Sequence, residues 1–103
     1  MIPVKDFKKE VLDWAEKVRV KPKEIHIRPM TKKWASCSSK GRLSFSYELL
    51  NQTLEARANV IVHELLHLRY PVHNKMFKYA LTSYLRKNQI KVWNKFELSS
   101  KDL

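Results

Sequence analysis

Apolar side chains recur at helical spacing over residues 5–19, and charged side chains fill the positions between them. The apolar positions are Phe7, Val11, Trp14, Ala15 and Val18. This pattern is typical of a helix that packs one face against a core. Pro22 follows, and proline cannot continue a helix. The pattern predicts an N-terminal packing helix.

Apolar and polar residues then alternate with the period of two that marks half-buried strands. The three runs are centred on Ile25 and Ile27, on residues 34–38, and on Leu43 and Phe45. The chain's single glycine, Gly41, lies between the second and third runs and can take a positive φ without steric cost. We expect a three-stranded sheet whose last two strands form a hairpin turned at Gly41.

Residues 54–68 are apolar on nearly every side of a helix, so they predict a buried central helix. Asn51 or Thr53 provides its start signal. A last helix begins at Asn74, a favoured N-cap residue, and carries an apolar face. Together these elements predict one small α+β domain over residues 1–103.

The composition fits a globular protein and adds a strong positive charge. Hydrophobic residues make up 44% of the chain, which argues against disorder. The net charge is +11, and residues 17–42 hold nine basic side chains against one acidic residue, Glu24. That stretch is either a solubilising surface or a binding surface for an anionic nucleotide or nucleic acid, and the sequence leaves both open.

Cysteine usage and the lengths of apolar runs point to the cytoplasm. Cys37 is the only cysteine, so no internal disulfide can form, whereas a small secreted domain normally carries several. No apolar run is long enough to cross a bilayer, and the N-terminus lacks the apolar core of a signal peptide. We therefore expect a cytoplasmic monomer with no membrane partner.

The central helix carries the run His63-Glu64-Leu65-Leu66-His67. Residues four apart lie on one face of a helix, about 6 Å apart along its axis, so both imidazoles can converge on one ion. The carboxylate of Glu64 can reach water at that ion without being a ligand itself. The motif therefore predicts a zinc site in which Glu64 is the catalytic general base.

A catalytic zinc site needs three protein ligands and one open position. His73 is the candidate for the third ligand, because it lies six residues beyond His67, across Pro71, just before the last helix. The fourth histidine, His26, has no place in this arrangement. We expect one zinc ion per chain, held by His63, His67 and His73.

Several other side chains allow more than one interpretation. Cys37 is either a small hydrophobe packed on a strand or a ligand that switches the metal site. Trp34 either belongs to the core or forms a platform for substrate. The candidates for stabilising an oxyanion are Tyr70, Tyr79 and Tyr84, and the sequence does not choose among them.

The run Trp34-Ala35-Ser36-Cys37-Ser38, the apolar run with its metal motif at 60–68, and His73 with Phe77 together resemble the YgjP-like metal-dependent hydrolases. These are related to the SprT-like and WLM metallopeptidases. The resemblance covers about residues 25–80. It implies a minimal zincin fold of the gluzincin type, with a packing helix, a small twisted sheet, an active-site helix and a second helix. It also implies zinc bound by the three histidines named above.

The chain departs from the family pattern in three ways. Ala35 replaces a usual glycine, Lys78 stands where an aromatic residue often follows Phe77, and the N-terminal domain of longer members is missing. The resemblance therefore implies a stand-alone minigluzincin with less of a substrate cleft.

The leading function is that of a zinc-dependent metallopeptidase, which would hold a peptide or protein substrate against an edge strand of the sheet. The alternative is a metal-dependent nucleoside triphosphate pyrophosphatase, an activity that some YgjP-like proteins resemble and that the positive stretch suits. A third hypothesis is a non-catalytic zinc domain associated with nucleic acid, as SprT-like relatives associate with DNA.

Residues 89–103 form a tail that is too apolar for a discarded linker. One hypothesis is that the tail covers the cleft and keeps the enzyme latent, as in a zymogen, with Glu97, Asp102 or the terminal carboxylate of Leu103 near the metal. The other is that Trp93 and Phe96 complete the core against the first helix. The sequence leaves both open.

Overall fold

The computed structural model describes residues 1–93, and its first element is helix α1 (Val4–Val18). The five apolar positions that predicted this helix are all buried. The helix ends at Arg19, whose left-handed backbone (φ 64°) lets its N–H bond back to the last turn. The prediction of an N-terminal packing helix is therefore confirmed.

The sheet has three strands, β1 (Glu24–Arg28), β2 (Ala35–Cys37) and β3 (Arg42–Ser46), in the order β1-β3-β2. Strands β2 and β3 are antiparallel, and the turn between them contains Gly41 with φ 84°, as predicted. Strand β1 instead pairs parallel to β3. This order puts β3 in the middle and β2 at one edge of the sheet.

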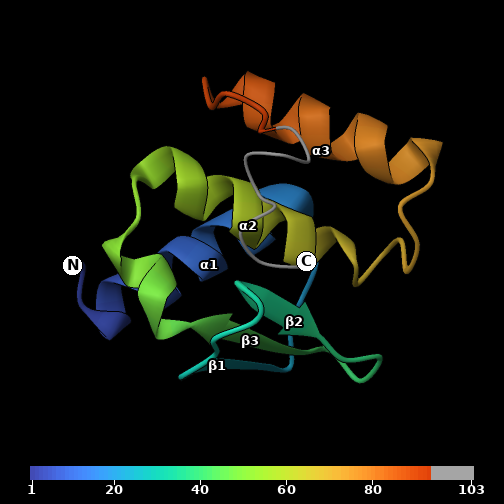
Figure 1. Cartoon of the computed structure of the whole chain (residues 1–103). Helices are drawn as coiled ribbons and strands as arrows, with labels where there is room; N and C mark the ends of the chain where they lie inside the picture. The colour runs from blue at the N-terminus through green and yellow to red at the C-terminus, as the bar shows by residue number, and fades with distance from the viewer. Residues whose placement is uncertain (94–103) are drawn as a thin grey trace.

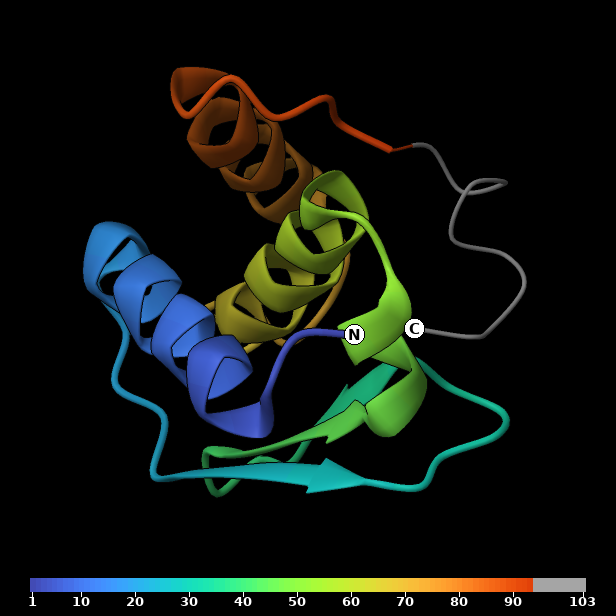
Figure 2. The same ribbon diagram turned by 90° about the vertical axis from the view of Figure 1, so that its left-hand side faces the viewer.

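The register between β2 and β3 determines which side chains face the core. Ala35 lies opposite Phe45 and Cys37 opposite Leu43, so the apolar side chains of both strands share one face. All three helices lie on that side of the sheet (Figure 2). The ring of Phe7 from α1 meets Phe45 edge-on at 5.2 Å between centroids, which joins the first helix to the central strand.

Helix α2 (Leu54–Leu66) runs through the middle of the molecule, between α3 and the sheet (Figure 1). Thr53 is its N-cap, because the Thr53 hydroxyl accepts the Ala56 N–H at 3.1 Å. Every residue from Ala56 to Leu66 is buried, as the all-round apolar pattern predicted. The helix ends two residues earlier than expected, because its last turn tightens into bonds between residues three apart.

Two elements flank α2. The short 3-10 helix η1 (Tyr47–Asn51) precedes it and was not predicted. Helix α3 (Lys75–Lys87) follows it and begins as predicted, since the Asn74 side chain accepts the Phe77 N–H at 2.9 Å. The structure thus has three α-helices and a small mixed sheet, an α+β fold. Within residues 1–93, no helix combines the length and apolar character needed to cross a membrane.

The first part of the C-terminal tail docks on α2. The buried amide of Asn59 donates to the Lys91 carbonyl at 2.9 Å and accepts the Trp93 N–H at 2.8 Å. The indole of Trp93 donates to Glu55 at 2.6 Å, so its hydrogen bonds go to α2 and not to the first helix. Phe96, Glu97, Asp102 and Leu103, which carry the rest of the tail hypotheses, lie outside the described residues.

Candidate metal centre and cleft

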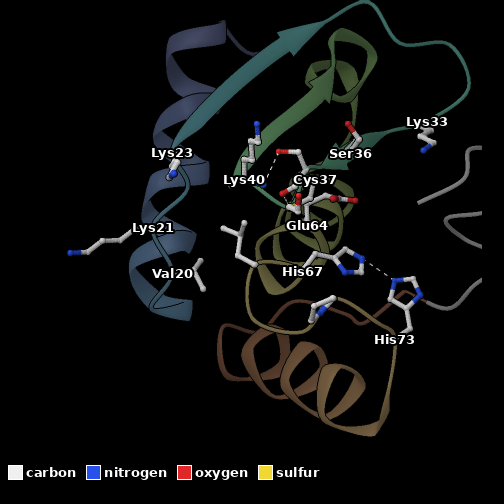
Figure 3. Close-up of a pocket in the computed structure, with 16 residues that line it drawn as sticks. Val20, Lys21, Lys23, Lys33, Ser36, Cys37, Lys40, Glu64, His67 and His73 are labelled. Carbon is white, nitrogen blue, oxygen red and sulfur yellow. Dashed lines mark hydrogen bonds between the residues drawn. The ribbon is translucent and has the colours of Figure 1, made fainter.

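Three imidazoles converge at the C-terminal end of α2. His63 lies in the last turn of the helix, His67 is its C-cap, and His73 comes from the loop before α3. Their Nε2 atoms are separated by 3.3 Å (His63 to His67), 3.2 Å (His63 to His73) and 3.0 Å (His67 to His73). Figure 3 shows His67 and His73 facing each other. These three residues could hold a metal ion.

The separations fit nitrogen ligands around one ion. Two nitrogens bound tetrahedrally at about 2.0–2.1 Å from zinc lie about 3.3 Å apart. The orientation of His67 also fits, because its Nδ1 lies 3.2 Å from the Tyr70 carbonyl and must donate to it. That bond leaves the Nε2 lone pair of His67 directed at the other two imidazoles.

The ring of Phe77 packs against all three imidazoles. Its ring centroid lies 5.0 Å from that of His63 and 4.9 Å from those of His67 and His73. The N-cap bond of Asn74 fixes the backbone at Phe77, so the start of α3 sets the position of this ring. Phe77 is itself 2% exposed, which leaves the imidazoles little room to turn away.

The surroundings of His63 and His67 favour the uncharged form of both imidazoles. Burial, followed by the charges of His67 and His73, lowers the pKa of His63 to about 3. Burial also lowers the pKa of His67, against the opposing effect of its bond to the Tyr70 carbonyl. Neutral imidazole is the form that binds a metal.

Glu64 lies beside this cluster and is almost fully buried, with 2% of its surface exposed. Burial raises the pKa of Glu64 to about 7, and the positive charge of Lys33 opposes that rise. A carboxyl group with such a pKa can exchange a proton near neutral pH. Sequence analysis missed Lys33, since no spacing rule relates a residue before β2 to one in α2.

A cleft of about 860 Å³ is lined by His67, His73 and Glu64. Edge strand β2 and the β2–β3 turn form one wall, and His67, Leu68, Pro71 and His73 contribute to the other (Figure 3). The edge strand therefore lies next to the candidate metal centre. The sequence analysis expected a peptide substrate to pair with such a strand.

The other candidate residues are distributed as follows. Cys37 and Trp34 both pack partly buried against the core, as the packing interpretation of each predicts. Cys37 also lines the cleft, and burial, with the charge of Glu64 adding to it, raises the pKa of the thiol. His26 lies apart from the imidazole cluster, exposed beside Glu24, as expected for the leftover histidine.

The three candidate tyrosines do not line the cleft. Tyr70 contributes its backbone carbonyl to His67, while Tyr79 is 74% exposed on α3. Tyr84 packs partly buried on the core. Within residues 1–93, Lys33 is thus the cleft-lining cation whose charge reaches Glu64.

Comparisons with known proteins identify the fold and the family of this chain. The chain is similar in structure to the metallopeptidase zymogen of Pyrococcus abyssi abylysin, with a TM-score of 0.63 and 18% identity over 84% of this chain and 99% of that one. At that identity the likeness concerns the fold. No curated protein matches the chain significantly. The family model "YgjP-like, metallopeptidase domain" matches residues 4–92. With nearly the whole described chain covered by that model, the protein belongs to the YgjP-like metallopeptidase family.

Proposed function

We propose that this protein is a zinc-dependent metallopeptidase in which His63, His67 and His73 bind the metal and Glu64 is the general base. The observation that supports this most is the cluster of three Nε2 atoms, 3.0–3.3 Å apart, next to a buried carboxyl group in an open cleft. A set of three imidazoles suits zinc, and it leaves one position for water or substrate.

In this proposal the metal and the residues around it have separate roles in hydrolysis. Bound zinc would supply Lewis-acid chemistry, polarising the scissile carbonyl and making water more acidic. Glu64 takes the proton from the attacking water and passes it to the leaving amine, a task for which a pKa of about 7 is suited. Phe77 and the Tyr70 carbonyl hold the imidazoles in place.

Edge strand β2 provides the means of holding a peptide. It is the outer strand of the sheet on the side of the cleft. A peptide that pairs with it would lie across the imidazoles in extended form, held by backbone hydrogen bonds. Latency through the C-terminal tail, residues 89–103, is part of this proposal. The fold likeness to a zymogen supports it.

A second candidate function is hydrolysis of nucleoside triphosphates. The cleft is lined by Lys21, Lys23, Lys33 and Lys40, whose charge would suit phosphate groups. The same metal centre could then act on a phosphoanhydride.

A single assay panel tests both. Zinc-loaded protein is given casein, a fluorogenic peptide library and the four nucleoside triphosphates. Glu64→Gln should keep zinc and lose about a thousandfold or more in turnover, because it removes the proton acceptor and spares the ligands. Glu16→Gln, at an exposed carboxylate on α1, is the matched control and should behave as wild type. Near-normal turnover by Glu64→Gln would contradict the assignment of the base.

A further inference from the structure

Four lysines line the cleft, and we call Lys21, Lys23, Lys33 and Lys40 the lysine rim. All four are exposed. Among residues 1–93, no carboxylate lies within ion-pair distance of any of them. The one acidic residue of the surrounding stretch, Glu24, is instead paired with Arg42 at 2.6 Å. Within this part of the chain, the rim therefore has no ion-pair partner, and its positive charge can attract an anionic ligand.

Backbone contacts hold two of these lysines at the same end of the cleft. The Lys23 N–H donates to the Gly41 carbonyl at 2.8 Å, which ties the start of β1 to the β2–β3 turn. A Cβ added at Gly41 would lie 3.5 Å from Lys23 Cγ, so the Lys23 side chain passes directly over that turn. Figure 3 shows Lys23 and Lys40 on one side of Glu64 and Lys33 on the other, while Lys21 points outward.

The direction of β2 relates these lysines to a bound peptide. The strand runs from Ala35, near Lys33, to Cys37, near the turn that carries Lys40. Antiparallel pairing is the more stable arrangement per residue. A peptide paired antiparallel to β2 would place the residues before its scissile bond beside Lys23 and Lys40.

We propose that the cleft selects peptides with acidic side chains on the N-terminal side of the scissile bond, through Lys23 and Lys40. This rests on the proposed peptidase function and names its substrate class. Positive charge along a concave wall raises the local concentration of acidic segments and repels basic ones. Lysines suit this task because each flexible chain can follow a carboxylate without a fixed geometry.

Acidic peptides fit the cleft better than nucleotides do. A nucleobase usually stacks on an aromatic ring. The described cleft lining has no aromatic side chain apart from the metal-centre imidazoles, and its apolar part comes from residues such as Val20, Leu68 and Pro71. The lining therefore offers charge and strand pairing, which an acidic peptide can use together.

Two measurements on the full chain test this proposal. In the first, a proteome-derived peptide library is digested by the zinc-loaded protein and the cleavage sites are read by mass spectrometry. In the second, zinc-loaded Glu64→Gln protein is titrated with two labelled peptides that differ only in having two glutamates or two glutamines before the cleaved bond. Both measurements are repeated with a protein that carries Lys23→Gln and Lys40→Gln together. The control pair is Lys5→Gln and Lys8→Gln, which removes the same charge from exposed positions on α1.

The acidic peptide should bind about fivefold to tenfold more tightly than its neutral counterpart at low salt, and less so at high salt. This preference should vanish with Lys23→Gln and Lys40→Gln and persist in the control pair. Equal affinities for the two peptides would overturn the proposal. So would an acidic preference confined to the C-terminal side of the cleaved bond, or the same loss of preference in both pairs of substitutions. In each of these cases a digested library would still support the peptidase function. An undigested library with neither peptide bound would overturn both. Inorganic triphosphate is offered in the same titration. If it binds tightly and the peptides show no acidic preference, the proposal is overturned in favour of a phosphate substrate.

Discussion

The ring of Phe77 lies against the imidazole of His63 at 5.0 Å between centroids, with the two planes inclined by 75°. Because Phe77 touches the other two imidazoles as well, it fixes the spacing of all three Nε2 atoms. Phe77→Leu keeps an apolar side chain but loses this contact. We expect zinc affinity to fall by about tenfold, as when outer-shell partners of metal ligands are removed. Competition with a chromophoric chelator measures the change. An unaltered affinity would show that Phe77 serves the core alone.

Removing the imidazoles themselves should have a graded effect. His63→Ala and His67→Ala should abolish zinc binding, and His73→Ala, at the exposed ligand position, should weaken it by more than about a hundredfold. His26→Ala is the control, since it removes a histidine outside the cluster and should leave one zinc per chain. Metal analysis by mass spectrometry after desalting decides this. A wild-type chain that keeps no added zinc would contradict the site.

The buried carboxyl group makes the metal-free protein sensitive to pH. Burial raises the pKa of Glu64 from its ordinary value of 4.5 to about 7. Folding therefore costs more as pH rises from 4.5 to 7, because over that range the unfolded carboxyl ionises first. Metal-free Glu64→Gln escapes this cost, so its free energy of unfolding at pH 8 should exceed that of wild type by about 3 kcal/mol.

Urea unfolding at two pH values measures that difference. At pH 5 the gap should shrink to under about 1 kcal/mol, because Glu64 is then protonated in the folded state and pH 5 lies only half a unit above the ordinary pKa of 4.5 that it has in the unfolded state. The opposite shift, a pKa of about 3 for buried His63, is present in both proteins and cancels. A gap of the same size at both pH values would show that the substitution acts through packing.

The contacts of the tail define where it can be cut. Ile90 and Val92 pack on the core, and Trp93 bonds to α2. Truncation after Trp93 should leave the melting temperature within a few degrees of wild type. Truncation after Asn88 removes these contacts and should lower it by roughly 10 °C or more. Latency predicts higher peptidase activity after the first cut, whereas unchanged activity with an intact fold would reject it.

Asn59 is the anchor of that tail. Its side chain is 1% exposed and bonds to the backbone of Lys91 and Trp93. Asn59→Leu should cost about 2 kcal/mol of stability, because the Lys91 carbonyl and the Trp93 N–H lose the buried amide that they bond to. It should also raise the hydrogen exchange of the Trp93 N–H. Asn51→Leu, at an exposed amide, is the control. Unchanged exchange at Trp93 would mean that the indole bond to Glu55 holds the tail without Asn59.

Sequence pattern predicted the elements that local chemistry determines. The period of the apolar residues located α1 and α2, Asn74 located the start of α3, and Thr53, one of the two candidates for the start of α2, is its N-cap. The convergence of His63 and His67 was predictable because helical geometry alone places residues four apart on one face.

Features that depend on distant segments could not be predicted in this way. The parallel pairing of β1 with β3 joins strands that are not consecutive in the chain, and a period of two carries no information on direction. The position of Lys33 beside Glu64 depends on how β2 packs on α2. The tyrosines were candidates by chemistry alone, and their places followed from the path of α3 and its preceding loop.

The three imidazoles all come from residues 63–73, whereas Lys23 and Lys40 reach the cleft from far earlier in the chain. Closing so short a loop costs little chain entropy, while docking the hairpin on α2 requires long-range contacts that form late in folding. The proposed metal site therefore depends on contacts between residues close in sequence, whereas the proposed substrate wall depends on contacts between distant ones. A chain whose sheet has transiently opened would keep the three proposed ligands close together while it lacks the wall on which we propose that a peptide is held.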